Sequence, residues 1–167
     1  MVQLLRLLGR VTPMGASFPP VAEVVPQRGR MMLLSSVLEH SDHHTVCAVE
    51  VGADSPFLET DGTVPALIGV EYMAQCVAAH AGLQRWAKGE GPRVGFLIGS
   101  RRLDFRSPLG FRVGQRLIVH VTRAWGEEEF AMFACRLIDA PSQAVLVEGN
   151  LNVFLPRSLD RFGVIPG

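Results

Sequence analysis

The most informative stretch of this 167-residue sequence is residues 65–84, PALIGVEYMAQCVAAHAGLQ. It carries a single formal charge, Glu71, and it opens on Pro65. Proline suits the first turn of a helix because its missing N–H would have no intrahelical partner there. Gly89 and Pro92 then close the segment. The pattern predicts one helix from Pro65 to about Lys88, apolar on nearly every side and therefore buried on nearly every side.

A helix of this length, roughly 35 Å at ~1.5 Å per residue, would be long enough to cross a bilayer. Its polar side chains, Glu71, Gln75, His80 and Gln84, would be costly in lipid, and strand-like segments lie on both sides of it in the sequence. We therefore expect the helix to be buried in protein, and we expect no membrane span.

Segments rich in apolar and β-branched residues flank the helix. Residues 31–39 and 45–51 precede it and are joined by the polar stretch 40–44, which is typical of a hairpin loop. Residues 93–105, 115–125, 129–138 and 144–154 come after it, separated by short turn sequences. An antiparallel sheet of about six strands wrapped around the central helix would bury that helix best, so the predicted fold class is α+β.

The chain is long enough for one domain and too short for two ordinary ones. We expect this domain over residues 24–156. Pro19, Pro20 and Pro26 indicate that residues 1–23 form an extended lead-in, because each proline fixes φ and removes a backbone donor. Residues 157–167 are expected to form a C-terminal tail.

The composition excludes several classes of function. Sixteen basic and sixteen acidic residues leave no formal net charge, so no whole-molecule attraction to nucleic acid or to an anionic membrane is implied. Cys47, Cys76 and Cys135 each lie in an apolar run and are expected to be small core residues. With the five histidines they form no metal-ligand spacing, and no phosphate-binding glycine loop or nucleophilic serine motif occurs. We therefore expect neither metal nor cofactor, and no nucleic-acid partner.

Four patches resemble the hot-dog fold and, within it, the (3R)-hydroxyacyl-[acyl-carrier-protein] dehydratases of fatty-acid synthesis. VPQR at 25–28 is similar to the family's opening motif, and PFL at 56–58 to the motif before its active-site loop. PALIGVEYMAQ at 65–75 resembles the family's central helix with its acidic residue and glutamine, while FLIG at 96–99 and FRSP at 105–108 resemble the strand and turn after that helix. The runs RGRM at 28–31 and GVEYMAQ at 69–75 are most similar to the predicted dehydratase of aryl-polyene pigment clusters.

The resemblance implies dehydration of a 3-hydroxyacyl thioester on an acyl carrier protein to a trans-2-enoyl thioester. Glu71 matches the family's catalytic acid, and an apolar helix favours the neutral carboxyl group that a general acid requires. Ala66 takes the place of the backbone donor to the thioester oxygen. Gln75, one helical turn beyond Glu71, either orients that carboxyl group or bonds to nearby backbone. Phe57 and Pro65 are expected to complete the substrate-binding residues.

The chain departs from the family at the general base. The family carries a histidine in the loop before the helix, whereas residues 58–64, LETDGTV, contain none, and Gln27 stands where a further histidine is usual. His80 lies nine residues from Glu71 and therefore on the opposite face of the helix. His40, His43 and His44 crowd the predicted hairpin tip, and His120 lies in mid-strand, where it could face the interior. Two alternatives to the dehydratase therefore stay open: a catalytically silent hot-dog subunit that binds acyl chains or pairs with an active homologue, and a hot-dog acyl thioesterase.

The apolar fraction of 48% and the mean hydropathy of +0.24 exceed what a monomer usually needs. We expect a homodimer, or a hetero-dimer with a related hot-dog subunit, in which two sheets join edge to edge and Glu71 lies at a narrow apolar tunnel near the interface. Arg101, Arg102 and Arg106 are expected to steer an acidic acyl carrier protein, with its phosphopantetheine arm, to that tunnel. Because the N-terminal residues lack the apolar core of a secretion signal, a cytoplasmic location is expected.

Overall fold

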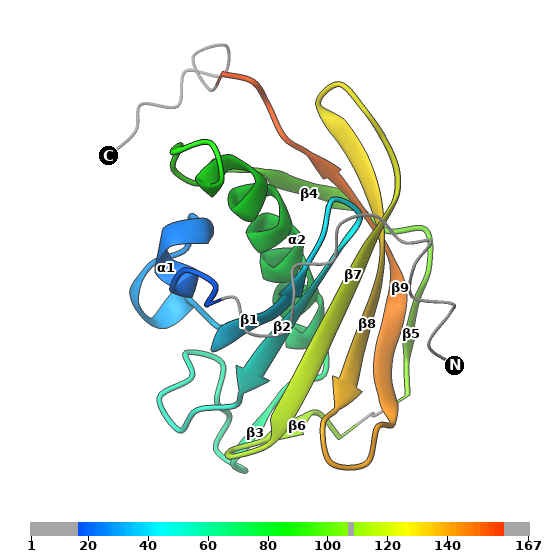
Figure 1. Ribbon diagram of the computed structural model, residues 1–167. Coiled ribbons are helices and arrows are strands. Elements are labelled where there is room, and N and C mark those ends of the chain that lie inside the picture. The colour runs from blue at the N-terminus through cyan, green and yellow to red at the C-terminus, as the bar shows by residue number, and fades with distance from the viewer. Residues whose placement is uncertain (1–16, 107–108, 159–167) are drawn as a thin grey trace, which may run out of the picture.

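One long helix lies in the concave face of a curled antiparallel sheet in the computed structural model, which describes residues 17–106 and 109–158 (Figure 1). The helix is α2 (Ile68–Trp86). The seven strands of the sheet are β1 (Ser36–His40), β2 (His44–Glu50), β7 (Arg116–Glu127), β8 (Phe130–Asp139), β9 (Val145–Phe154), β4 (Phe96–Gly99) and β5 (Leu103–Phe105). They run in the order β1-β2-β7-β8-β9-β4, with β5 also paired to β9. This is the α+β hot-dog arrangement that the sequence predicted.

The core lies between α2 and the inner face of the sheet. Alternate residues of the central strands, such as Leu117 and Val119 on β7 and Leu137 on β8, are fully buried, as the period of two in a half-buried strand requires. Gly69 lets the helix press onto this face, because a Cβ there would lie 3.0 Å from Leu137 and 3.1 Å from Phe111. The three cysteines are buried in the core, as expected, and none of them forms a disulfide.

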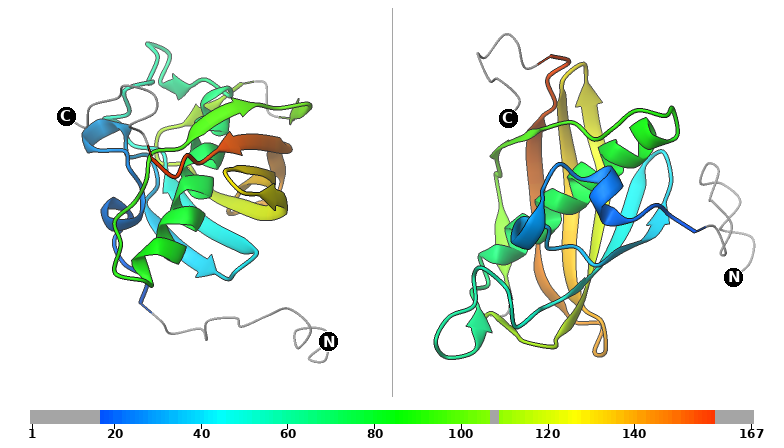
Figure 2. Two further views of the ribbon diagram at one scale, coloured as in Figure 1. Left: turned by 90° about the horizontal axis from the view of Figure 1, so that it is seen from above. Right: turned by 90° about the vertical axis from the view of Figure 1, so that its left-hand side faces the viewer.

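The N-terminal lead-in is not extended throughout, contrary to the prediction. Residues Val21–Val24 form a short helix, α1, which begins directly after Pro20, where a missing N–H costs nothing. Val21 and Val24 are buried. Figure 2 shows α1 against the side of α2 that faces away from the sheet, and a Cβ on Gly82 would lie 1.8 Å from the Val24 carbonyl oxygen. This close packing outweighs the local preference for extended chain.

Other element boundaries also differ from those predicted. α2 begins at Ile68, although the Ile68 N–H already donates to the Pro65 carbonyl (2.9 Å), so the first turn does start at the proline. The strand predicted from residue 31 begins only at Ser36, after a 3₁₀ turn over Gly29–Met31. The segment predicted as one strand over 93–105 is divided into β4 and β5, with Gly99 at φ 152° at the break.

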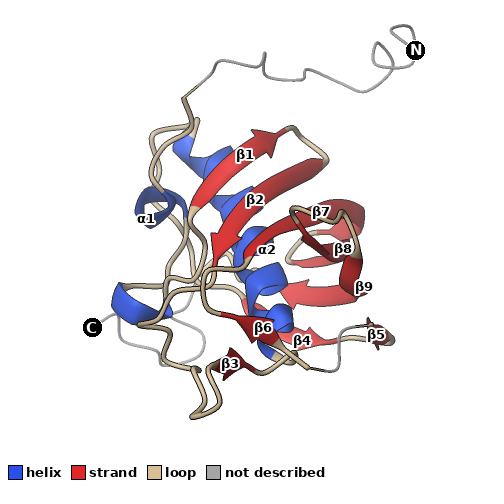
Figure 3. Cartoon of the chain, turned by 90° about the horizontal axis from the view of Figure 1, so that it is seen from below, coloured by secondary structure: helices blue, strands red, loops and turns tan. Residues whose placement is uncertain are grey.

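A second, two-stranded sheet pairs β3 (Thr63–Val64) with β6 (Phe111–Arg112). Figure 3 shows it beside the N-terminal end of α2. It anchors the chain immediately before the helix, where the sequence had indicated only a loop. Within residues 17–106 and 109–158, no helix has the length and apolar character that a bilayer crossing requires. Residues 1–16 of the predicted lead-in and 159–167 of the predicted tail lie outside the described residues.

Candidate active site

Glu71 lies in the first turn of α2 and lines a cavity of about 120 Å³. The other walls are mostly apolar: Ala74, Val77 and Ala78 from the same helix, Phe96 and Leu97 from β4, and Val153 and Leu155 from the end of β9 and the residues after it. Gln27 and Arg93 are the polar residues that share this cavity with Glu71. The cavity therefore offers an apolar seat with a carboxyl group at one side, which is what an acyl thioester requires.

Gln75 holds Glu71 in place and is itself fully buried. Its Nε2 donates to Glu71 Oε1 (2.8 Å) and to the Met31 carbonyl (2.7 Å), while its Oε1 accepts from the Leu33 N–H (2.9 Å). The two roles considered for this residue are thus both present in the structure. One amide fixes the carboxyl group to the chain segment that leads into β1.

Gln27 leaves a buried polar atom without a partner. Its Oε1 is inaccessible to solvent and, among the described residues, has no hydrogen-bond donor. Buried polar groups nearly always have a hydrogen-bond partner in proteins. An unpaired polar atom in the wall of a cavity therefore favours a bound molecule that supplies the missing hydrogen bond. The sequence had marked Gln27 only as a replacement for histidine.

The remaining predicted substrate residues do not line this cavity. Ala66 and Pro65 lie just before α2, and their carbonyls accept from the N–H groups of Gly69 (3.0 Å) and Ile68 (2.9 Å). Phe57 packs against the edge of the core. Direct contact of these three residues with substrate stays a prediction, as does the donor role of the Ala66 N–H.

The predicted docking arginines are partly neutralised by acidic neighbours. Arg102 Nε forms an ion pair with Asp104 (2.8 Å), and Arg106 pairs with Glu148. Arg101 is exposed, and no ion pair to it is formed within residues 17–106 and 109–158. Their role in carrier-protein docking stays a prediction, with Arg101 the cation left most available.

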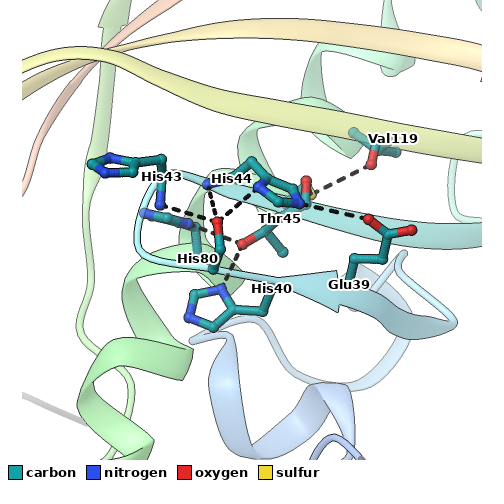
Figure 4. Close-up of polar contacts among 9 residues, drawn as sticks. Glu39, His40, His43, His44, Thr45, His80 and Val119 are labelled. Carbon is teal, nitrogen blue, oxygen red and sulfur yellow. Dashed lines mark hydrogen bonds and ion pairs between the residues drawn. The ribbon is translucent and has the colours of Figure 1, made fainter. Parts of the chain in front are cut away.

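A separate histidine cluster lies at the other end of α2 (Figure 4). The Thr45 hydroxyl of β2 bridges His40 Nδ1 (2.8 Å) and His80 Nδ1 (2.9 Å), and the His80 ring packs edge-on against Phe133. Burial, together with the nearby His40 and Arg123 charges, lowers the pKa of His80 to about 3. His80 is therefore neutral near pH 7, and it lies on the sheet side of the helix, away from the Glu71 cavity.

The other histidines do not reach Glu71 either. Ser41 Oγ bonds to His44 Nδ1 (2.7 Å), so His44 belongs to the β1–β2 hairpin, and His43 is exposed at the tip. His120 is exposed between the buried Val119 and Val121, so it faces away from the helix. In the described part of the chain, no three histidine, cysteine or acidic residues are placed to hold a metal ion.

Comparison with known proteins places these features in context. A family model described as ApeP dehydratase matches residues 19–163. No curated protein matches the chain. A solved chain of the dehydratase heterocomplex ApeI:P from Xenorhabdus doucetiae is similar at 30% identity over 90% of this chain and 100% of that chain, with a TM-score of 0.80.

More distant structures share the fold alone. TT0310 from Thermus thermophilus is 20% identical over 78% of this chain and 100% of that chain, with a TM-score of 0.55. PaaI from Escherichia coli is 13% identical over 71% of this chain and 81% of that chain, also with a TM-score of 0.55. Their similarity to this chain is one of overall fold.

Proposed function

Since the chain belongs to the ApeP dehydratase family, we propose that it dehydrates a 3-hydroxyacyl thioester on an acyl carrier protein, contributing Glu71 to an active site that a second hot-dog subunit completes. The observation that carries this proposal is the Glu71 cavity itself. A carboxyl group fixed by Gln75 at 2.8 Å faces an apolar space, and the cavity walls, all within the described part of the chain, include no histidine.

Dehydration of a 3-hydroxyacyl thioester requires one general base and one general acid. A base removes the C2 proton, the electron pair forms the C2–C3 double bond, and the C3–O bond breaks. The Glu71 carboxyl proton passes to the departing hydroxyl, so that water leaves and Glu71 is left as a carboxylate. This chain supplies the acid, and no imidazole lies beside it in the described residues. The base is therefore assigned to a second subunit.

The free edge of the sheet supports such a partner. Among the described residues, β4 pairs with β9 alone, and its apolar side chains are exposed to solvent: Phe96 is 40%, Leu97 46% and Ile98 56% exposed. Phe96 and Leu97 also line the Glu71 cavity. A subunit paired along β4 would cover this apolar edge and bring its own residues to the cavity mouth.

A hetero-dimer fits this requirement better than a homodimer. A second copy of this chain would bring another loop LETDGTV, which carries no histidine. A related subunit with the loop histidine would supply the base. The similar protein from Xenorhabdus doucetiae is described as part of a dehydratase heterocomplex. By the sequence resemblance, the acyl group is an aryl-polyene intermediate, and a carrier-protein substrate would place the reaction in the cytoplasm.

The experiment uses the full chain alone, a histidine-bearing hot-dog subunit alone, and the two co-purified. Each is incubated with a 3-hydroxyacyl carrier protein, and the acyl-pantetheine mass is followed. We expect loss of one water with the pair, and far slower loss with either subunit alone. Dehydration by the second subunit alone at the rate of the pair would make this chain catalytically silent. Release of the acyl group without loss of water would make it a thioesterase.

A further inference from the structure

Gln27, in the wall of the Glu71 cavity, has a side-chain oxygen that the described part of the chain leaves unpaired. The nearby Gln75, by contrast, uses both ends of its amide, donating from Nε2 and accepting at Oε1. A buried acceptor without a donor costs free energy in the folded protein. The glutamine at position 27 therefore does not serve the fold through Oε1, and a bound molecule that donates to this oxygen would account for it.

The backbone around Gln27 is held on both sides. Arg28 Nη1 donates to the carbonyls of Val25 (2.5 Å) and Gln27 itself (2.8 Å), and Val25 is fully buried. Further along the chain, the Met31 carbonyl accepts from Gln75 Nε2 (2.7 Å). Gln27 thus lies on a short segment fixed at both ends, and the second fixed point is the same amide that holds Glu71.

The other polar groups in the cavity wall are donors. Glu71 Oε1 accepts from Gln75, so in the acid form of Glu71 the carboxyl proton lies on Oε2, to which no hydrogen bond is formed within residues 17–106 and 109–158. Arg93 donates to the Arg157 carbonyl (3.2 Å), and a guanidinium has no acceptor. The cavity measures about 120 Å³, room for roughly four water molecules at ~30 Å³ each, so a group bound in it lies close to both Glu71 and Gln27.

A ligand group that satisfies both residues must accept a hydrogen bond from Glu71 and donate one to Gln27. A hydroxyl group does both with one oxygen. We infer that the C3 hydroxyl of the substrate lies between Glu71 Oε2 and Gln27 Oε1, and that Gln27 thereby selects 3-hydroxyacyl chains over chains without this hydroxyl. The inference rests on the proposed function for the identity of the substrate.

This arrangement fits the elimination of water. The hydroxyl proton points to Gln27, which leaves a lone pair of the same oxygen turned towards the Glu71 proton. As the base takes the C2 proton and the C3–O bond breaks, the Glu71 proton moves to the departing oxygen, and the water that forms still donates to Gln27. Gln27 itself neither gains nor loses a proton, so its role is to bind and orient the leaving group.

The first test measures binding with probes that do not react. Pantetheine amides of 3-hydroxybutanoate and of butanoate differ only in the C3 hydroxyl. Nitrogen in place of the thioester sulfur makes their C2 protons much less acidic, so they are not dehydrated. Titrations followed by NMR give both affinities for the full-length protein, in the assembly in which it purifies. The variants are Gln27→Leu and, as a matched control, Gln84→Leu at the other end of α2, outside the walls of the Glu71 cavity.

The wild-type protein should bind the hydroxyl probe about 3- to 10-fold more tightly than the butanoyl probe. Gln27→Leu should abolish this preference by weakening the hydroxyl probe alone, and Gln84→Leu should retain it. Equal affinities in the wild-type protein would mean that Gln27 pairs with an ordered water only. Equal weakening of both probes by Gln27→Leu would mean that it pairs with the pantetheine amide. Either result would overturn the inference.

The second test separates binding from support of the fold. Leucine has a similar volume and removes the unpaired acceptor, so Gln27→Leu should unfold at the same urea concentration as wild type or at a higher one. A lower concentration would show that the Gln27 amide stabilises the fold, and would overturn the inference. Since neither test involves dehydration, both are independent of the proposed reaction, whose failure would appear as absent water loss in the two-subunit assay.

Discussion

Replacing Gln75 with leucine should destabilise the protein by about 2–4 kcal/mol, since it removes the amide that ties α2 to the segment before β1. Leucine fills a similar volume but leaves the Leu33 N–H and the Met31 carbonyl without their partners at 2.9 and 2.7 Å. An unpaired buried polar group costs roughly 1–3 kcal/mol, and these sites are only part-buried, so each is taken at the lower part of that range. The bond to Glu71 is lost as well.

The assay is urea unfolding followed by tryptophan fluorescence at fixed protein concentration, because assembly contributes to apparent stability. Glu71→Gln is the matched comparison. It keeps an oxygen that can accept from Gln75 and disturbs neither backbone contact, so a change below about 1 kcal/mol is expected. If Gln75→Leu unfolds at the same urea concentration as Glu71→Gln, the amide does not anchor the segment and the reasoning fails.

Three further perturbations have measurable consequences. The free energy of unfolding should fall as the pH drops from about 6.5 towards 3, because His80 is protonated in the unfolded chain over this range while burial holds its pKa in the folded protein at about 3. In urea unfolding, His80→Gln should reduce this pH dependence by up to about 1.4 kcal/mol per pH unit, whereas the control His43→Asn should leave it unchanged. Gly82→Ala should cost about 1–3 kcal/mol in thermal unfolding, since the added methyl group meets the backbone of α1; unchanged stability would contradict that packing. Carrier-protein binding, measured by calorimetry, should weaken with salt, and it should weaken more with Arg101→Ala than with Arg102→Ala, whose charge is already paired with Asp104. Absent effects would remove the docking role, and equal effects would contradict the claim that this ion pair reduces the contribution of Arg102.

The sequence predicted those helices and strands whose limits are set by the local pattern of apolar residues. The long apolar stretch from Pro65 defined α2 to within three residues at its start, and alternation located the central strands to within a residue or two. α1 was missed because its stability comes from distant contact: Val24 packs on Gly82, far along the chain. Likewise, the division of β4 from β5 depends on how both pair with β9 and on the backbone at Gly99.

In the candidate active site too, the sequence predicted contacts between residues that are close together along the chain. Glu71 and Gln75 are one turn apart, so their hydrogen bond could be predicted from the sequence. The two backbone partners of Gln75, the orphaned oxygen of Gln27 and the position of Arg93 in the cavity wall all depend on segments brought together only by folding. No local pattern signals such contacts.

The most direct test of the central claim is the single-turnover dehydration rate of the two-subunit complex with Glu71→Gln in this chain alone. The amide cannot give up a proton, so the rate should fall by about 10²- to 10⁴-fold while the complex still assembles. Glu59→Gln, which changes an exposed carboxyl group in the loop before the helix, should keep the wild-type rate. A Glu71→Gln complex that dehydrates the carrier-bound substrate as fast as wild type would contradict the claim that this chain supplies the acid.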